Sequence, residues 1–364
     1  MKEFKVLAVD GGGIKGLYSA KILSLFEADL RREHGDAVRI VDYADLICGT
    51  STGGLIALAL ALRIPAETIC EFYETKGPKI FKGSQGVLAR LRQTLWGGKF
   101  SDKALRDALQ EMFEERTMAE SECLICIPTY DFTHGTYEVF KFDHKEGGLS
   151  RHNKLSMVDV ALATSAAPTF FPLAQIEKEN NTQYVDGGVW ANNPSLVGLT
   201  EAMSHFVGPG KAFDHLNLLS VSSLNFSAGK PPLLKRHRSF LRWAPDLFDL
   251  SLIAQSEFTD IFLGLTQQWK IVPITYTRVP SAVISREQAR YITLDLVTPE
   301  TFTLMKQFAT DMYYEYRRKP SVQGFFAAPK RYRVRDSSPT PRDLNAATAA
   351  AELPFAADGA LRTS

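Results

Sequence analysis

Two short apolar runs, each ending at glycines and followed by a helical pattern, constrain the fold of this chain most. Residues 4–10, "FKVLAVD", lead into three glycines, and apolar residues then recur at helical spacing from Ile14 to Leu30. "DLICG" and "LIALALAL" repeat this order, with Ser51 near the junction. Buried strands that alternate with helices predict an α/β layer structure with a mainly parallel central sheet flanked by helices.

The rest of the chain continues this alternation. We expect a helix over residues 101–115, two strands around a turn over 122–142, and a capped helix over 156–168. A short strand over 182–186 and a buried strand over 216–223 follow. We interpret residues 1–330 as one domain with a signature core over 5–200 and an extension over 201–330. Residues 331–364 are rich in Ala, Pro, Ser and Thr, which predicts a flexible tail.

Composition limits the classes of function. The net charge of the 364 residues is +1, which argues against DNA or RNA as a partner. Four cysteines are too few for a disulfide framework, and we place the pair Cys123 and Cys126 in a buried strand. The apolar start of the chain is too short for a signal peptide, so we expect a cytoplasmic protein. The apolar stretch around Ser51 is long enough for a membrane span, but its polar centre favours a buried strand, a turn and a helix.

Ser51 lies in a pattern that is typical of a catalytic nucleophile. Gly49, Ser51 and Gly53 form GxSxG between the predicted strand and helix, which is the context of a nucleophile elbow. Small residues permit the strained turn that lifts the hydroxyl clear of the backbone, and the helix N-terminus favours developing negative charge. The pattern therefore predicts an activated serine.

The glycine cluster "DGGGIKG" allows two interpretations. Its glycines also match GxGxxG, which would make a nucleotide- or phosphate-binding loop with Glu33 or Asp36 as the ribose-binding acid. Those acids, however, follow a predicted helix and do not end a strand. In the other interpretation, the backbone N–H groups of Gly11, Gly12 and Gly13 form an oxyanion hole that faces Ser51.

An activated serine needs a base. The histidines all lie in polar stretches, so we expect solvated side chains; they are His34, His134, His144, His152, His205, His215 and His237. A catalytic triad in which one of these histidines is the base remains an alternative. The better candidate is Asp186, which ends a short strand before Gly187 and Gly188, because a partly buried carboxylate can accept the serine proton directly.

Three blocks taken together resemble the patatin-like phospholipases. These blocks are DGGGIKG at 10–16, GTSTG at 49–53 and DGG at 186–188, and "ATSAAPTFFP" at 163–172 adds to the likeness. The resemblance implies a three-layer patatin-like fold. It also implies that Ser51 is the nucleophile, that Asp186 is the base, and that Gly11, Gly12 and Gly13 supply the oxyanion hole.

The implied activity is that of a lipid acyl hydrolase. The resemblance implies a serine hydrolase of the carboxylic ester class, EC 3.1.1, which cleaves phospholipid acyl esters through an acyl-enzyme and needs no metal or organic cofactor. Asp10, Lys15 and Gly16 complete the first block. Lys15 stands where many members have arginine, and "LSVSS" replaces a glycine-containing strand end. Neither departure touches the predicted dyad.

A lipid substrate implies peripheral contact with a membrane, which we expect to be the inner membrane. Residues 230–245 mix basic and apolar side chains, which suits an interfacial segment, and Trp96 with Phe100 is a second candidate for a lid or membrane contact. The size of the chain and its extension resemble those of anti-phage effectors that cyclic oligonucleotides activate. A housekeeping lipase or esterase is the alternative.

Overall fold

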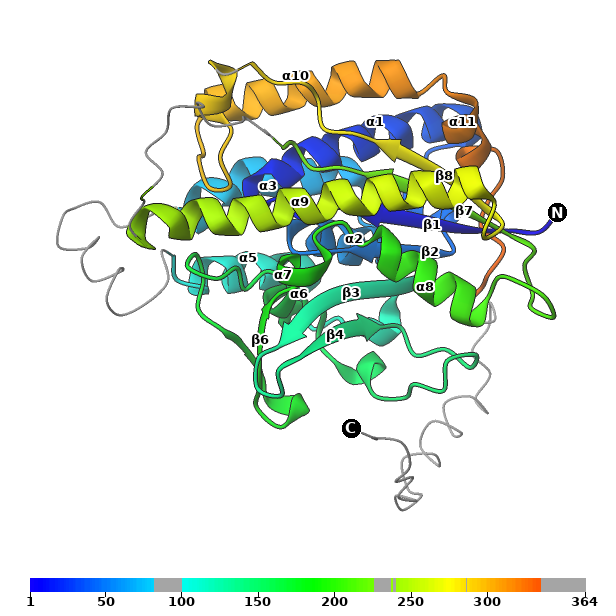
Figure 1. Ribbon diagram of the computed structural model, residues 1–364, viewed down its shortest axis with the longest axis horizontal. Coiled ribbons are helices and arrows are strands. Elements are labelled where there is room, and N and C mark those ends of the chain that lie inside the picture. The colour runs from blue at the N-terminus through cyan, green and yellow to red at the C-terminus, as the bar shows by residue number, and fades with distance from the viewer. Residues whose placement is uncertain (82–99, 226–236, 238–239, 286, 335–364) are drawn as a thin grey trace.

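The central sheet of the computed structural model runs through the whole molecule (Figure 1). The structure describes residues 1–81, 100–225, 237, 240–285 and 287–334. Within these residues eight strands form one sheet in the order β5-β6-β3-β2-β1-β7-β8, and β4 pairs with β3. The strands are β1 (Glu3–Val9), β2 (Leu46–Gly49), β3 (Leu124–Asp131), β4 (Thr136–Lys141), β5 (Ala174–Ile176), β6 (Thr182–Asp186), β7 (His215–Val221) and β8 (Ile274–Val279).

The strands from β3 to β8 in this order pair in parallel, and the opposite edge of the sheet is antiparallel. β1 pairs in parallel with both β2 and β7, β2 with β3, and β7 with β8. β4, β5 and β6 join by antiparallel pairing. β1 and β2 are almost entirely buried, because helices cover both faces of the parallel part. The predicted α/β class is confirmed.

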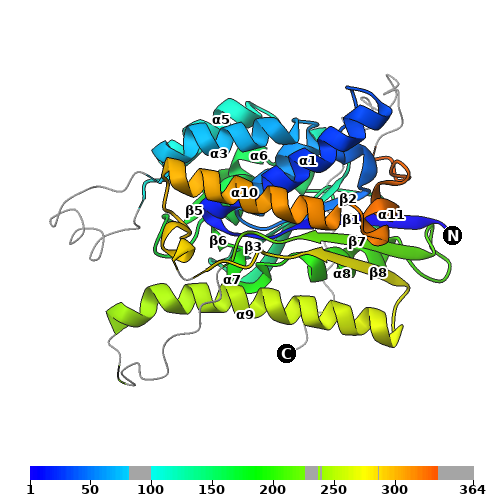
Figure 2. The ribbon, with the colours of Figure 1, turned by 90° about the horizontal axis from the view of Figure 1, so that it is seen from above.

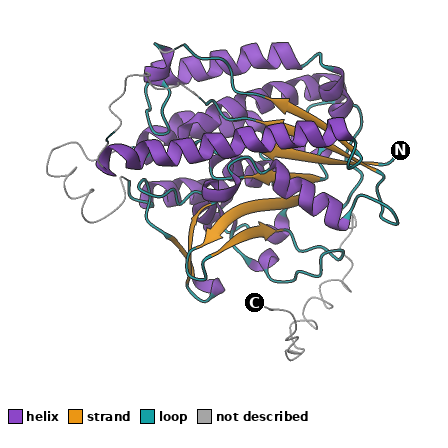
Figure 3. Ribbon diagram, in the orientation of Figure 1, coloured by secondary structure: helices purple, strands orange, loops and turns teal. Residues whose placement is uncertain are grey.

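Helices form a layer on each face of the sheet (Figures 2 and 3). α1, α3 and α10 lie on one face, while α7, α8 and α9 lie on the other (Figure 2). The α-helices are α1 (Gly16–His34), α2 (Thr52–Ala61), α3 (Ala66–Ile80), α5 (Lys103–Phe113), α6 (Met157–Thr164), α7 (Gly188–Ala191), α8 (Ser195–His205), α9 (Phe240–Trp269), α10 (Pro299–Tyr316) and α11 (Pro320–Phe326). In the described part of the chain, no helix is both long and apolar enough to cross a bilayer.

The region after residue 200 is built into the same sheet as the predicted signature core. β7 pairs with β1 over the full length of both strands, and β8 extends the sheet beyond β7. α10 packs along α1 on one face, and α9 crosses the other (Figure 2). The extension therefore completes the layers around the two strands that end at the glycine clusters.

α2 follows the predicted strand and turn directly, and it is buried along its whole length. A helix that is apolar on every side belongs inside a protein or a membrane, and here the sheet and its neighbours surround it. The predicted sequence of strand, turn and buried helix around Ser51 is confirmed. All four cysteines are buried and free; Cys126 lies in β3 as expected, whereas Cys123 directly precedes this strand.

Several sequence expectations need correction or fall outside the described residues. His144 and His152 are buried and not solvated. Burial lowers the pKa of His152 to about 3, so this ring is neutral. Phe100 is buried against Phe81, Phe170 and Phe171, which rules it out as an exposed membrane contact. Trp96, most of the 230–245 segment and all but the first four residues of the predicted tail lie outside the described residues.

Candidate active site

Ser51 lies on a sharp turn between β2 and α2. Its φ of 54° and ψ of −125° are rarely adopted by a residue with a side chain. The chain can fold this tightly because a Cβ on Gly49 would lie 2.0 Å from the Gly53 carbonyl oxygen, so only glycine fits there. The Ser51 N–H donates to Thr164 Oγ1 at 3.0 Å, which anchors the turn to α6. This is the backbone geometry of a nucleophile elbow.

Asp186 is the hydrogen-bond partner of the Ser51 hydroxyl. Ser51 Oγ donates to Asp186 Oδ2 at 2.6 Å, and the Gly188 N–H donates to Asp186 Oδ1 at 2.7 Å. The Asp186 N–H donates to the Ala166 carbonyl at 3.0 Å, which ties the end of β6 to the "SAAP" segment. The structure thus brings together two side chains that are 135 residues apart in the sequence.

The environment of Asp186 favours the protonated form of its carboxyl group. The side chain is almost completely buried, and burial raises its pKa to about 7. The hydrogen bonds from Ser51 and Gly188 stabilise the carboxylate and limit this rise. A carboxyl group with a pKa near neutrality can accept and return a proton at physiological pH.

The glycine loop after β1 lies beside Ser51. A Cβ on Gly11 would lie 3.3 Å from Ser51 Cβ, which shows how closely the loop approaches the serine. The Gly11 N–H donates to the Asn192 carbonyl at 3.0 Å, so that group is already engaged, in contrast to our expectation for Gly11. Gly12 and Gly13 line the same pocket as Ser51. Their N–H groups are therefore the ones in this loop that can meet a bound carbonyl oxygen.

An apolar pocket extends from Ser51 and Asp186. Its walls are mainly aliphatic and aromatic, and they include Leu55, Phe72, Ile80, Phe170, Phe171 and Phe248. Phe100 packs behind Phe170 and Phe171 and supports this wall. No histidine of the described residues lines the pocket, which gives Ser51 no imidazole partner there. The pocket can accept a hydrocarbon chain and exclude water from the serine.

A buried ion pair between Asp10 and Arg278 lies next to the glycine loop. Asp10 is fully buried, and Arg278 of β8 meets its carboxylate through both terminal nitrogens, at 2.5 and 3.3 Å. Arg278 Nη1 also donates to Ser220 Oγ at 2.6 Å. Sequence reasoning missed Arg278; the one available signal was a basic residue inside the apolar strand "ITYTRV".

Three further residues position the glycine loop or the elbow and were not singled out from the sequence. Asn192 accepts from Gly11, and its side-chain amide donates to Ser256 Oγ of α9 at 2.9 Å. Ser223 belongs to the "LSVSS" block, which differs from the family pattern, and it donates to the Gly11 carbonyl at 2.7 Å. Thr164 holds Ser51 and donates to the Pro128 carbonyl at 2.6 Å. Asn192 and Ser223 thus hold the glycine loop, and Thr164 holds the elbow.

Lys15 and the other predicted supporting residues lie around this centre. Burial lowers the pKa of Lys15 to about 8, and its Nζ donates to Asn225 Oδ1 at 3.2 Å. Gly16 and Gly187 pack closely, because a Cβ there would meet Thr52 Oγ1 at 2.3 Å and the Pro128 carbonyl at 2.1 Å. Glu33 is exposed on the last turn of α1, away from any strand end, so it does not suit the ribose-binding role.

The known proteins that match this sequence are phospholipases and patatin-like proteins. The family model described as patatin-like phospholipase matches residues 7–197. A cGAMP-activated phospholipase of Pseudomonas aeruginosa is 34% identical over 260 residues, which cover 71% of this chain and 74% of that protein. A cGAMP-activated phospholipase of Vibrio cholerae is 31% identical over 236 residues, 61% of this chain and 64% of that protein. Patatin-like protein 1 of Arabidopsis thaliana is 37% identical over 218 residues, 56% of this chain and 52% of that protein.

The solved structures that match are more distant. VipD from Legionella pneumophila has a TM-score of 0.37 and 11% identity, covering 87% of this chain and 67% of that one. The type III effector ExoU has a TM-score of 0.38 and 12% identity, covering 91% of this chain and 57% of that one. These values are too low to carry an argument about the site.

Proposed function

This chain belongs to the patatin-like phospholipase family, and we propose that it hydrolyses fatty-acyl esters of membrane phospholipids with Ser51 as nucleophile and Asp186 as base. The observation that carries this proposal is the 2.6 Å hydrogen bond from Ser51 Oγ to Asp186 at the base of an apolar pocket. The proposal places the protein among the serine hydrolases of the carboxylic ester class.

In the first step, Ser51 Oγ attacks the ester carbonyl while Asp186 takes the hydroxyl proton. The carbonyl oxygen becomes an oxyanion, and the N–H groups of Gly12 and Gly13 together with the N-terminus of α2 stabilise it. When the tetrahedral intermediate collapses, the ester C–O bond breaks and Asp186 returns its proton to the leaving lyso-lipid alkoxide. The acyl chain remains on Ser51 as an ester.

In the second step, water replaces the leaving group. Asp186 removes a proton from the water as its oxygen attacks the acyl carbonyl, and the same N–H groups hold the second oxyanion. Collapse breaks the bond to Ser51 Oγ, which recovers the proton from Asp186, and the fatty acid leaves. One carboxyl group with a pKa near 7 serves both steps.

We also propose that the exposed face of α9 contacts the membrane. Helical geometry of about 100° per residue places Leu247, Leu250, Phe258, Ile261 and Trp269 within an arc of about 100°. Each of these side chains is at least 51% exposed, and no charged residue falls in the arc. Phe248 and Leu252 of α9 lie outside this arc and line the pocket. One helix would therefore touch both the bilayer and the acyl chain.

The membrane proposal is tested with the double variant Phe258→Asp, Ile261→Asp. We expect weaker binding to phosphatidylcholine vesicles and slower fatty acid release from them, but unchanged hydrolysis of a soluble short-chain ester. Tyr314→Asp on α10, an exposed aromatic on the other side of the molecule, is the matched control and should behave as wild type. Unchanged vesicle binding would refute the membrane contact, and a dimer that the double variant dissociates would show that a second copy of the chain covers this face.

We propose that a cyclic oligonucleotide activates this hydrolase, in the manner that the names of the Pseudomonas and Vibrio relatives describe. Such control would fit an enzyme of anti-phage defence that acts at the inner face of the membrane. The alternative is a housekeeping lipase or esterase, which would be active without a nucleotide.

The central experiment measures fatty acid release from mixed phospholipid vesicles by wild type, Ser51→Ala and Asp186→Asn, with and without cyclic GMP–AMP. We expect activity that both substitutions abolish and that the nucleotide increases. A fluorophosphonate should label wild type and not Ser51→Ala. Activity that survives in Ser51→Ala would refute the nucleophile, whereas nucleotide-independent activity would refute only the activation.

The interpretation of the glycine loop as a phosphate-binding loop fits the site less well. The Asp186 carboxylate and the Ser51 hydroxyl lie directly beside the loop, so a bound phosphate would face a carboxyl group that ionises near pH 7. Helix N-termini bind anions best where no carboxylate competes. The absence of fluorophosphonate labelling, combined with nucleotide binding, would favour that interpretation.

A further inference from the structure

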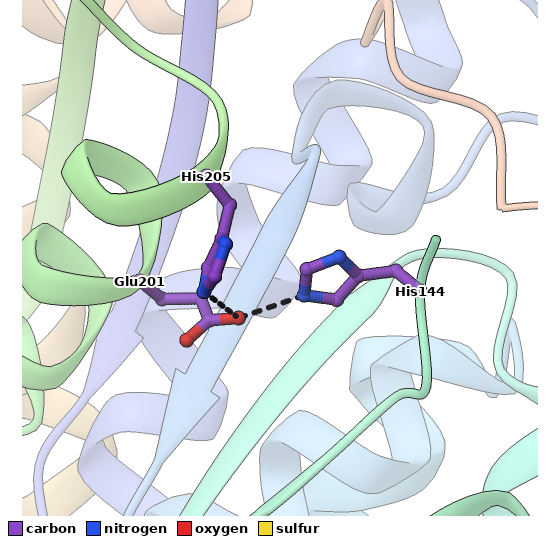
Figure 4. Close-up of side chains that lie close together, drawn as sticks. All are labelled: His144, Glu201 and His205. Carbon is purple, nitrogen blue, oxygen red and sulfur yellow. Dashed lines mark hydrogen bonds and ion pairs between the residues drawn. The ribbon is translucent and has the colours of Figure 1, made fainter. Parts of the chain in front are cut away.

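A cluster of two histidines and one glutamate lies away from Ser51, at the far end of α8. Glu201 and His205 are one turn apart on this helix, and His144 comes from the segment that follows β4 (Figure 4). α8 begins at Ser195, three residues after Asn192 of the active site, and ends at His205. With a rise of 1.5 Å per residue, the two ends of this helix are about 15 Å apart. The cluster is thus spatially separate from the predicted dyad.

The atoms of these three side chains that could bind a metal ion face one another. His144 Nε2 lies 2.8 Å from Glu201 Oε1, and His205 Nε2 lies 4.0 Å from the same oxygen (Figure 4). All three donor atoms lie within 4.8 Å of one another. Tetrahedral Zn²⁺ with bonds of about 2.0–2.1 Å holds its ligand atoms about 3.3 Å apart, so shifts below about 1 Å would close the set.

The surroundings of His144 are those of a metal-binding imidazole. Its other ring nitrogen, Nδ1, faces Glu146 Oε2 at 3.3 Å, and the Tyr332 hydroxyl donates to that same oxygen at 2.8 Å. A ligating histidine typically directs its second N–H to a carboxylate, which fixes the tautomer and strengthens the ligand. His144 Nε2 is directed into the cluster, and the buried Nδ1 lies near the Glu146 carboxylate without making a hydrogen bond to it, so a small rotation of the ring would complete that contact.

Glu201 is prepared to act as a ligand through one oxygen. Its Oε2 accepts from Lys141 Nζ at 2.6 Å, which leaves Oε1 facing the two imidazoles. His205 is partly exposed and offers an entry path from solvent.

We propose that His144, Glu201 and His205 bind one Zn²⁺ ion, with water as the fourth ligand. Two imidazole nitrogens and one carboxylate oxygen suit zinc, whereas Mg²⁺ and Ca²⁺ prefer oxygen ligands alone. The ion replaces the proton that His144 Nε2 shares with Glu201, and that proton goes to solvent. The site is structural: it ties the segment after β4 to α8 and, through Glu146, to Tyr332 near the C-terminal end of the described chain.

The proposal is independent of the proposed hydrolysis and is tested on the full chain after treatment with EDTA. Equilibrium dialysis should find one Zn²⁺ per chain, and zinc should raise the melting temperature. His205→Gln should abolish this binding, and Glu146→Gln should weaken it about 10–100-fold through the orienting contact. His134→Gln is the matched control, since His134 is an exposed histidine paired with Asp131, and it should bind zinc as wild type does.

Lys141→Met separates a metal site from a network of hydrogen bonds. Removal of the ammonium group beside Glu201 should tighten zinc binding, because the cation repels the ion. A network without metal would only be destabilised by this change. Wild type that binds no zinc, or His205→Gln that keeps one zinc per chain with an intact circular dichroism spectrum, would overturn the proposal. If His205→Gln does not fold, the affinity of Glu146→Gln decides.

Discussion

The pH dependence of ester hydrolysis offers the sharpest check on the role of Asp186. Burial raises the pKa of this carboxyl group from 3.8 to about 7. A shift of about three units corresponds to about 4 kcal/mol in favour of the neutral form. The base is active only when ionised, so the rate should follow the ionised fraction.

The size of the effect follows from the two pKa values. With a pKa near 7, about 1% of Asp186 is ionised at pH 5 and about 90% at pH 8, so kcat/KM should rise roughly 90-fold between these values. With the ordinary pKa of 3.8, the group would already be more than about 90% ionised at pH 5, and the rate would stay nearly constant.

The assay is hydrolysis of a soluble, non-ionising short-chain ester by wild type from pH 5 to pH 9 at constant ionic strength. The profile should be repeated at two temperatures, because a carboxyl pKa changes little with temperature whereas an imidazole pKa falls on warming. A flat profile above pH 5 would refute the argument from burial. An inflection that moves with temperature as an imidazole does would show that a histidine, and not Asp186, is the base.

The remaining predictions concern stability and the glycine loop. The folded pKa of Asp186 exceeds its unfolded value, so the unfolded chain ionises first and the group costs stability as pH rises from about 4 to 7. The free energy of unfolding of Asp186→Asn, measured in urea, should therefore rise relative to that of wild type by about 2–3 kcal/mol between pH 5 and pH 8. A difference between the two proteins that stays constant with pH would contradict this. Arg278→Met leaves Asp10 buried without its partner and should lower the free energy of unfolding by about 3–5 kcal/mol, while a loss under about 1 kcal/mol would mean the pair is dispensable. In Gly12→Ala the new Cβ would lie 2.6 Å from Ser223 Oγ, so the loop must move and kcat should fall about 100-fold or more. Gly324→Ala is the control, because a Cβ there has no atom within 4 Å. Equal rates for the two variants would argue against an oxyanion role.

Residues close in sequence determined much of the local structure. The pattern of apolar run, glycines and helical spacing predicted β1 with α1 and β2 with α2, because these elements depend on short-range periodicity and on turns that only small residues permit. The same pattern placed Ser51 between a strand and a helix. Asp186 was preferred as the base of Ser51 from its place at the end of a short strand before two glycines, and the resemblance between motifs supported the same pairing.

The tertiary structure decided what the chain brings together over long distances. Asp10 meets Arg278 across 268 residues, and neither local pattern nor motif identifies that partner. His144 lies in a polar stretch, yet Glu201 from α8 and the ring of Phe206 bury it, so local polarity misjudged its exposure. Burial and charge depend on which elements pack against a residue, and this packing also raises the pKa of Asp186. The sequence by itself determined the strands, glycine turns and helices around Ser51, and the packing of distant elements decided which polar groups meet and how they ionise.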